Sequence, residues 1–174
     1  MTTRHEAASA CARSFTFFWS HREDAVHPEC SQFYPRPVIL AGSSFNCCEQ
    51  WMHWRKALLF DDATTAAAIL AETSPMKQKL LGRQVAGFSR AIWNSVARDI
   101  VFRGNVAKFS QHADLLERLR RTCGTLLVEA SPMDAVWGIG VASTDPLASR
   151  RETWPGTNWL GEVLTEVRAS LCGD

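Results

Sequence analysis

Helix-forming patterns run through most of the 174-residue chain and leave only short gaps in which strands fit. Apolar residues at helical spacing, with start and stop signals around them, predict helices over residues 46–60, 63–72, 75–82, 91–102, 106–120 and 159–171. Short runs of β-branched and aromatic residues predict strands over residues 14–19, 38–40 and 125–128. At a length that suits one hydrophobic core, this order predicts a single, mainly helical α+β domain with a few short strands.

Polar and conformationally special residues mark the expected ends of the domain and of its helices. Residues 1–13 are polar and alanine-rich, and we expect a flexible N-terminal tail there before a domain over residues 14–174. Asn46 is the expected N-cap of the first helix, with Glu49 three residues later as in a capping box. Gly82 is the expected end of a later helix that starts at Pro75.

The charge balance and the cysteines limit the classes of partner and compartment. Nineteen lysines and arginines nearly cancel eighteen aspartates and glutamates, so no strong field favours nucleic acid or membrane as a partner. The six cysteines form no CxxC pair, and the N-terminus lacks the pattern of a secretion signal. We therefore expect a soluble, intracellular or cytoplasmic protein with free, buried thiols.

The segment from Glu129 to Gly140 reads as a functional loop rather than a core strand. It follows an expected buried strand and places Glu129, Asp134 and Trp137 around a glycine-containing turn. Gly138 and Gly140 permit that turn, and Trp137 suits a cover on the core as well as a platform on which a ligand stacks. A local hydrogen bond that holds the loop is the alternative role for the segment at Glu129.

Polar residues also recur on the first helix. Glu49, His53 and Lys56 stand at i, i+4 and i+7, which places them on one helix face. Spacing alone favours a solvent-facing stripe over the wall of a cleft, because such stripes are common on amphipathic helices. The histidines and cysteines show no spacing typical of metal ligands, so we expect no metal site.

Two further residues have both a structural and a functional interpretation. Arg83 follows an expected helix end, where a guanidinium either holds the last carbonyl groups or grips a phosphate. Trp93 lies on an expected helix, where a large aromatic side chain most often packs into the core. The residues alone leave both alternatives open.

Motifs spread from about residue 15 to residue 171 resemble, in order and spacing, those of the NADAR family, whose name refers to NAD and ADP-ribose. They are Ser31-Gln32-Phe33-Tyr34-Pro35, Glu49-Gln50-Trp51 with Lys56-Ala57, Ser74-Pro75, Leu81-Gly82-Arg83, Trp93, Lys108-Phe109, Val128-Glu129-Ala130-Ser131, Asp134, Trp137-Gly138-Ile139-Gly140, and Trp159-Leu160-Gly161 with Val167-Arg168. Gln32 stands where the family more often has asparagine, and Trp51 stands where it commonly has tyrosine.

The resemblance implies a metal-independent N-glycosidase that needs no cofactor. Members act on ribosylated amino-pyrimidine intermediates of riboflavin synthesis, or remove ADP-ribose from the amino group of guanine in nucleic acid. Glu49, Trp93 and Asp134 match family positions tied to catalysis, and Lys56 matches a further candidate. The residues expected to bind substrate are Phe33, Tyr34, Trp51, Arg83, Trp137, Gly138 and Gly140.

The implied chemistry suits these residue types. Cleavage of a C1–N bond at ribose develops oxocarbenium-like positive charge, which one carboxylate stabilises while another activates water or protonates the departing amine. Glu49 and Asp134 are expected to divide these roles. In a second route the ribose opens to an imine, and a desolvated Lys56 captures C1 as a Schiff base.

Three functions remain in competition at this point. The first is removal of ADP-ribose from ADP-ribosylated guanine in nucleic acid, and the second is cleavage of a nucleotide-like riboflavin intermediate. The third is a non-catalytic module that binds ADP-ribose, which would not require Glu49, Lys56 and Asp134 together. Near-neutral charge suits a small substrate or a terminal nucleotide better than tight duplex binding. We expect ADP-ribose as the product, no membrane partner and a monomer.

Overall fold

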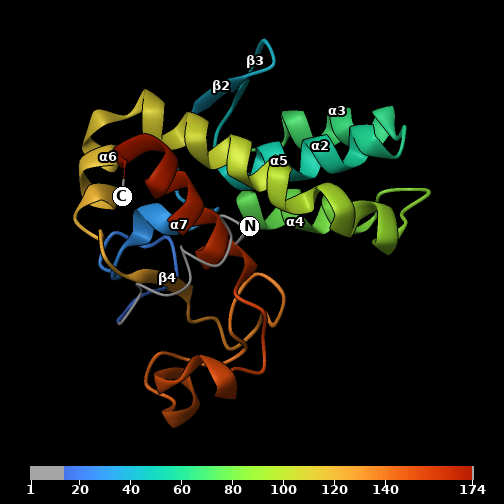
Figure 1. The fold of residues 1–174 in the computed structure, drawn as a ribbon. Helices are drawn as coiled ribbons and strands as arrows, with labels where there is room; N and C mark the ends of the chain where they lie inside the picture. Colours follow the sequence, from blue (N-terminus) through green and yellow to red (C-terminus); the bar gives the residue numbers. More distant parts are fainter. Residues whose placement is uncertain (1–13, 174) are drawn as a thin grey trace, which may run out of the picture.

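A computed structural model describes residues 14–173 of the chain, and helices predominate in it (Figure 1). The helices are α2 (Cys48–Leu59), α3 (Ala63–Ala71), α4 (Pro75–Arg83), α5 (Arg90–Gln111), α6 (Ala113–Arg120) and α7 (Trp159–Cys172). The strands are β1 (Phe15–Phe18), β2 (Val38–Leu40), β3 (Ser43–Phe45) and β4 (Leu126–Glu129), and the 3-10 helices are η1 (Pro28–Cys30), η2 (Pro146–Ser149) and η3 (Arg151–Thr153). The predicted α+β fold is confirmed, whereas the expected tail over residues 1–13 lies outside the described part.

The strands form two small, separate sheets. β1 pairs with β4 in parallel, with Phe18 opposite Glu129. β2 and β3 form an antiparallel hairpin that projects from the helices (Figure 1), and its turn residues Ala41 and Gly42 have φ of 51° and 75°. Positive φ at both positions fits the twist of a tight hairpin. The predicted strand over 38–40 is therefore confirmed. Strand β3 was not predicted, because a run of only Ser-Ser-Phe does not indicate a strand.

Hydrogen bonds on both edges of β4 fix the position of Glu129. On the β1 side, the N–H of Ala130 donates to the carbonyl oxygen of Phe18 (2.9 Å). On the other side, Asn158 Nδ2 donates to the Leu127 carbonyl (3.0 Å) and its Oδ1 accepts from the Glu129 N–H (2.9 Å). The strand thus extends one residue beyond the predicted end at 128 and carries Glu129 to the edge of the cavity described below.

One helix was predicted with a break that the structure does not have. α5 runs without interruption from Arg90 to Gln111, whereas the sequence predicted separate helices on either side of Gly104. Gly104 serves close packing instead, since a Cβ there would lie 2.6 Å from Cδ1 of Trp51. The chain changes direction at His112, which ends α5 and begins α6.

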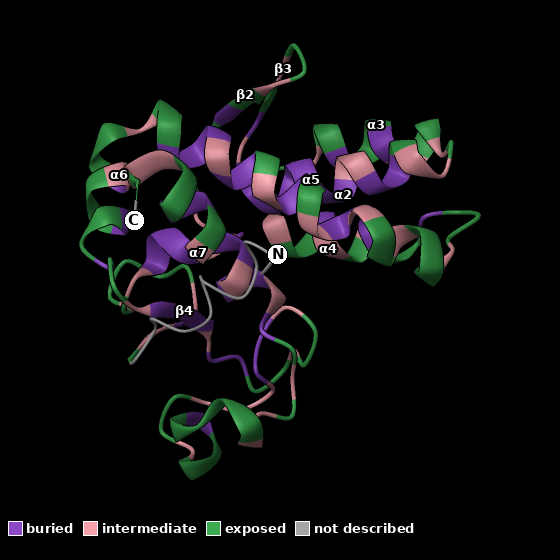
Figure 2. Ribbon diagram, viewed as in Figure 1, coloured by how far each residue is buried: buried purple, intermediate pink, exposed green. Residues whose placement is uncertain are grey.

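Buried residues gather on the inner faces of α2, α5, α7 and β4, whereas η2 and η3 are largely exposed (Figure 2). The main core cluster includes Phe18, Met52, Phe109, Leu127, Leu160 and Leu164. This shared core holds α2 and β4, which carry most of the carboxyl groups discussed below, in one rigid frame. No helix within residues 14–173 has the length and apolar character needed to cross a membrane.

Candidate active site

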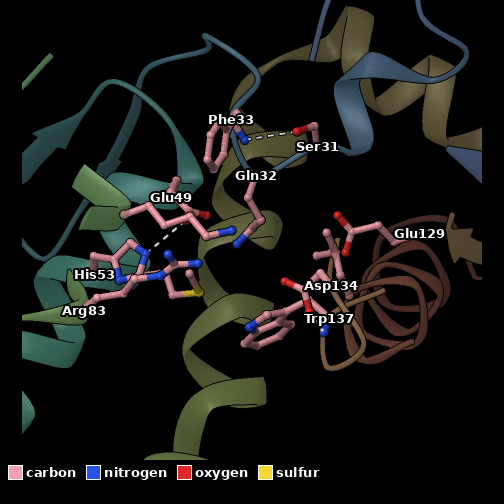
Figure 3. Close-up of a pocket in the computed structure, with 12 residues that line it drawn as sticks. Ser31, Gln32, Phe33, Glu49, His53, Arg83, Glu129, Asp134 and Trp137 are labelled. Atoms are coloured by element: carbon pink, nitrogen blue, oxygen red, sulfur yellow. Dashed lines mark hydrogen bonds and ion pairs between the residues drawn. The ribbon is translucent and has the colours of Figure 1, made fainter. Parts of the chain in front are cut away.

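A cavity of about 120 Å³ lies where α2, α4, the end of β4 and the loop after β4 meet. Figure 3 shows Glu49, His53 and Arg83 on one side of it and Glu129, Asp134 and Trp137 on the other. Its full lining is Ser31, Gln32, Phe33, Glu49, Met52, His53, Lys79, Arg83, Glu129, Asp134, Trp137 and Leu160. The fold thus brings five of the predicted site residues together, namely Phe33, Glu49, Arg83, Asp134 and Trp137.

The first turn of α2 supplies the carboxylate of Glu49. The helix begins at Cys48 with Cys47 at the N-cap position, so the predicted cap at Asn46 is wrong. Asn46 instead donates through Nδ2 to the Thr73 carbonyl (2.7 Å). The side chain of Glu49 does not close a capping box, because its Oε1 lies 2.9 Å from Nε2 of His53. The positive end of the helix dipole favours a carboxylate at this place.

The polar stripe of α2 is buried, contrary to the solvent-facing arrangement that its spacing favoured. Glu49, His53 and Lys56 are 4%, 7% and 9% exposed. α3, α4 and α5 all pack against α2 and leave it little free surface. A buried Glu–His pair in a cavity wall is a candidate for proton transfer or charge stabilisation rather than a surface ion pair.

Lys56 lies next to the end of α4 and is not part of the cavity lining. Its Nζ donates to the Gly82 carbonyl (2.7 Å) and lies 4.2 Å from the centroid of the Phe88 ring and 5.8 Å from that of Trp93. Burial, followed by the positive charge of Arg83, lowers the pKa of Lys56. Lys56 and Trp93, both predicted to be catalytic, therefore lie near each other and outside the lining of the cavity.

The predicted helix end at Gly82 is confirmed to within one residue, because α4 continues to Arg83. A Cβ at Gly82 would lie 2.0 Å from Nδ1 of His53. We expect Gly82→Ala to displace the His53 ring, to cost about 1–3 kcal/mol of stability and to lower turnover. Melting temperature and kcat measure the two effects, with the exposed Lys77→Ala on the same helix as control. An unchanged kcat and melting temperature would show that this contact does not hold the ring.

The loop after β4 is built around Asp134. Its Oδ1 accepts hydrogen bonds from the N–H groups of Val136 and Trp137, both at 2.9 Å, and its carbonyl accepts from Gly140 (3.2 Å). Gly138 passes so close to the strand that a Cβ there would lie 2.8 Å from the Glu129 carbonyl oxygen. The two glycines shape the loop, and the N–H of Gly140 is engaged inside it.

Two substitutions separate the chemistry of Asp134 from its structural role. Asp134→Asn keeps an oxygen acceptor for the loop but removes the charge, so we expect a melting temperature near wild type and kcat lowered at least about tenfold. Asp134→Ala removes both hydrogen bonds as well, so its melting temperature should also fall. Equal kcat for Asp134→Asn and wild type would leave Asp134 with a structural role alone.

Two predicted substrate-binding aromatic residues lie outside the cavity. Trp51 is 4% exposed, and its Nε1 donates to the Ile100 carbonyl (2.8 Å). Stacking on a ligand would require this side chain to leave the core. Tyr34 packs against the main core cluster and supports the segment that carries Phe33.

The cavity also contains Lys79 and Glu129, for which the sequence predicted neither a catalytic nor a substrate-binding role. Lys79 and Glu129 line it and also line a wider groove of about 970 Å³ beside it. Lys79 stands four residues before Arg83 on α4, so helical spacing could have paired the two. Spacing grouped His53 with Glu49 but favoured a solvent-facing stripe, whereas the entry of Glu129 into the cavity depends on the pairing of β4.

Glu129 has the most perturbed environment among these acids. Burial, then the negative charges of Asp134 and Glu49, raise the pKa of Glu129 to about 8, and the positive charge of Lys79 opposes that shift. The residue as a whole is partly exposed, but its Oε2 atom is buried and makes no hydrogen bond with any described residue. The carboxyl group is therefore mostly protonated at neutral pH.

Buried polar atoms without a partner are concentrated at this cavity. Within residues 14–173 the buried side-chain atoms that make no hydrogen bond are Gln32 Nε2, His53 Nδ1, Asn105 Oδ1 and Glu129 Oε2. All but Asn105 belong to residues of the cavity lining. Because folded proteins rarely leave such groups unpaired, this concentration indicates a place for a polar ligand.

The buried cysteines of the described residues are not suited to nucleophilic chemistry. Burial raises the pKa of Cys30 and Cys47 to about 12, so neither thiol is an effective nucleophile at neutral pH. The prediction of free, buried thiols is confirmed for Cys30, Cys47 and Cys48. No group of three or more His, Cys, Asp or Glu side chains in residues 14–173 could hold a metal ion.

Comparison with known proteins places the chain in a family. The model of the NADAR domain matches residues 17–172. Protein irg-1 of Caenorhabditis elegans is 45% identical over 129 residues, which are 73% of this chain and 61% of that protein. N-glycosidase R617 of Acanthamoeba polyphaga mimivirus is 43% identical over 120 residues, covering 69% of this chain and 71% of the relative. N-glycosidase YbiA of Escherichia coli is 30% identical over 154 residues, covering 88% and 86%.

A solved structure agrees with this result. The NMR structure of the E. coli protein YbiA superimposes with a TM-score of 0.75 and 29% sequence identity, and covers 92% of this chain and 86% of YbiA. The names of the relatives support an N-glycosidase activity in the family. The chain belongs to the NADAR family.

Proposed function

We propose that this protein is an N-glycosidase that hydrolyses the bond between C1 of a ribose and a nitrogen atom. The observation that carries the proposal is the small cavity with Glu49 on one wall and Asp134 on the other (Figure 3). Carboxyl groups on both sides of the scissile bond suit a reaction that develops positive charge at C1 and needs a proton at the leaving group. The chemistry requires neither a metal nor a cofactor.

We propose that the physiological bond joins ADP-ribose to the amino group of guanine in nucleic acid. The groove beside the cavity has a volume of about 970 Å³, about eight times the 120 Å³ of the cavity. It therefore offers room for more than one ribose and one ring. Trp19, Met76 and Met133 line the groove and are 51%, 57% and 88% exposed. Exposed aromatic and thioether surface suits stacking on a base, and Arg83 and Lys79 suit the phosphates of ADP-ribose.

One experiment separates the candidate functions. The protein is incubated with an ADP-ribosylated guanine oligonucleotide and, separately, with a ribosylated amino-pyrimidine intermediate of riboflavin synthesis. We expect release of ADP-ribose from the first to have at least about tenfold higher kcat/KM than cleavage of the second. The opposite preference would favour the riboflavin intermediate. Binding of ADP-ribose without any release from either compound would identify a non-catalytic module.

A substitution in the groove tests whether the groove selects for the larger substrate. Trp19→Ala should raise KM for the oligonucleotide about tenfold, because stacking of a base on an aromatic side chain contributes about 1–3 kcal/mol. The same substitution should leave the small amino-pyrimidine substrate almost unaffected. Equal effects on both substrates would show that the groove does not select for the larger one.

A further inference from the structure

The carboxyl group of Glu129 has no role in the two-carboxylate scheme, although it shares the same cavity. It ends β4, where hydrogen bonds to its backbone on both sides hold it in register. Figure 3 shows its side chain on the same wall as Asp134 and across from Glu49. A third acid at this place, with a buried and unpartnered Oε2, needs an explanation.

Resting on the proposed N-glycosidase function, we propose that Glu129 is the acid that protonates the departing nitrogen. As the C1–N bond breaks, its electron pair stays on the nitrogen, and the Glu129 proton moves to that nitrogen to release a neutral amine. Water, activated by Glu49 or Asp134, then adds to C1, and the proton that it loses passes through that carboxylate to restore the acid form of Glu129. Atoms and charge balance without any further reactant.

The surroundings of Glu129 suit a proton donor. The negative charges that face it are Asp134 from the loop and Glu49 from α2, and the positive charges are Lys79 and Arg83 from α4, while the imidazole of His53 on α2 also lines the cavity. Burial and the two carboxylates disfavour the charged form, so the proton is held at neutral pH. A donor whose pKa lies near the working pH transfers its proton most effectively. Glu49 and Asp134 are then left to stabilise C1 and to activate water.

The first test is the dependence of kcat on pH between about 6 and 9.5, in wild type, Glu129→Gln and the exposed control Glu117→Gln. Wild-type kcat should be high below the pKa of the acid and fall as the pH rises through about 8. Glu129→Gln should lower kcat about a hundredfold and lose this fall, since an amide has no acid proton. Glu117→Gln should match wild type. Glu129→Gln with kcat within a few-fold of wild type, or with the same fall, would overturn the proposal.

The second test follows the protonation of Glu129 through the melting temperature and does not depend on turnover. A carboxyl group with a raised pKa in the folded state stabilises the fold below its unfolded pKa and loses that contribution as the pH rises through its folded pKa. Glutamine imitates the protonated acid, so Glu129→Gln and wild type should melt alike at pH 5. The variant should melt at a higher temperature than wild type at pH 9. Parallel melting curves across this range would contradict the proposal.

These measurements distinguish failure of the proposed N-glycosidase function from failure of the proposed role of Glu129. If wild type released no ribosyl product from either substrate, the proposed function would fail, and the proton-donor role would fail with it. An active wild type with an unaffected Glu129→Gln would remove only the role of Glu129. If Glu129→Gln does not fold, Glu129→Asp serves as a second variant, because it keeps a carboxylic acid but shortens the side chain by one methylene. An unchanged kcat for Glu129→Asp would also exclude Glu129 as a positioned proton donor.

Discussion

Glu49→Gln is expected to lower kcat by at least about a hundredfold, because acid–base or charge-stabilising carboxylates contribute that much to catalysis. Glu49 lies in the first turn of α2 with its Oε1 2.9 Å from Nε2 of His53, so its orientation is fixed before a substrate binds. Glutamine keeps the size of the side chain and a hydrogen-bonding oxygen. The melting temperature should therefore stay close to that of wild type.

The measurement combines single-turnover kinetics with thermal melting for wild type, Glu49→Gln and the surface variant Glu117→Gln. Loss of rate in the chemical step with unchanged substrate binding would place the effect in the transition state. Glu49→Gln with turnover within a few-fold of wild type would exclude Glu49 from the chemistry. A large drop in melting temperature would instead assign it to the support of His53.

The sequence predicted the helical part of the fold well because most helices carry their own local signals. The helix that starts at Pro75 and the final helix from Trp159 have a proline or an apolar stripe at the expected place. The predicted gap between residues 102 and 106 is wrong, and at Gly104 and Gly82 the missing side chain makes room for an aromatic or imidazole ring from α2. Such contacts depend on the tertiary structure and leave no periodic signal.

The candidate site was predicted only in part, because the packing that assembles it also depends on the tertiary structure. The loop after the strand pointed to Asp134, resemblance assigned roles to Glu49, Arg83 and Asp134, and the structure brings all three to one cavity. Spacing alone placed Glu49 on a surface stripe, since burial of that face depends on how α3, α4 and α5 pack on it. The position of Glu129 in the cavity depends on the register of β4 with β1, which a four-residue strand does not reveal.

Two lysines compete for the covalent route, because resemblance points to Lys56 whereas the cavity contains Lys79. In that route the ribose ring opens, a neutral amine attacks C1, the base leaves as an amine and water hydrolyses the resulting Schiff base. The lowered pKa of Lys56 favours it as the nucleophile. Its Nζ, however, donates to the Gly82 carbonyl and lies against the Phe88 ring, so it would have to leave both to reach C1.

If the covalent route operates in place of direct attack by water, borohydride added during turnover should trap a sugar-phosphate adduct on Lys79, the lysine that lines the cavity, and Lys79→Ala should lose the adduct together with at least about a hundredfold in kcat. Lys56→Arg should retain substantial activity, because arginine keeps a positive charge beside the Gly82 carbonyl. Peptide mass mapping identifies the modified lysine. An adduct on Lys56 would support the assignment made by resemblance and would require α4 to shift. Rapid turnover without any adduct would exclude both lysines as nucleophiles and leave direct attack by water, assisted by the carboxyl groups, as the mechanism.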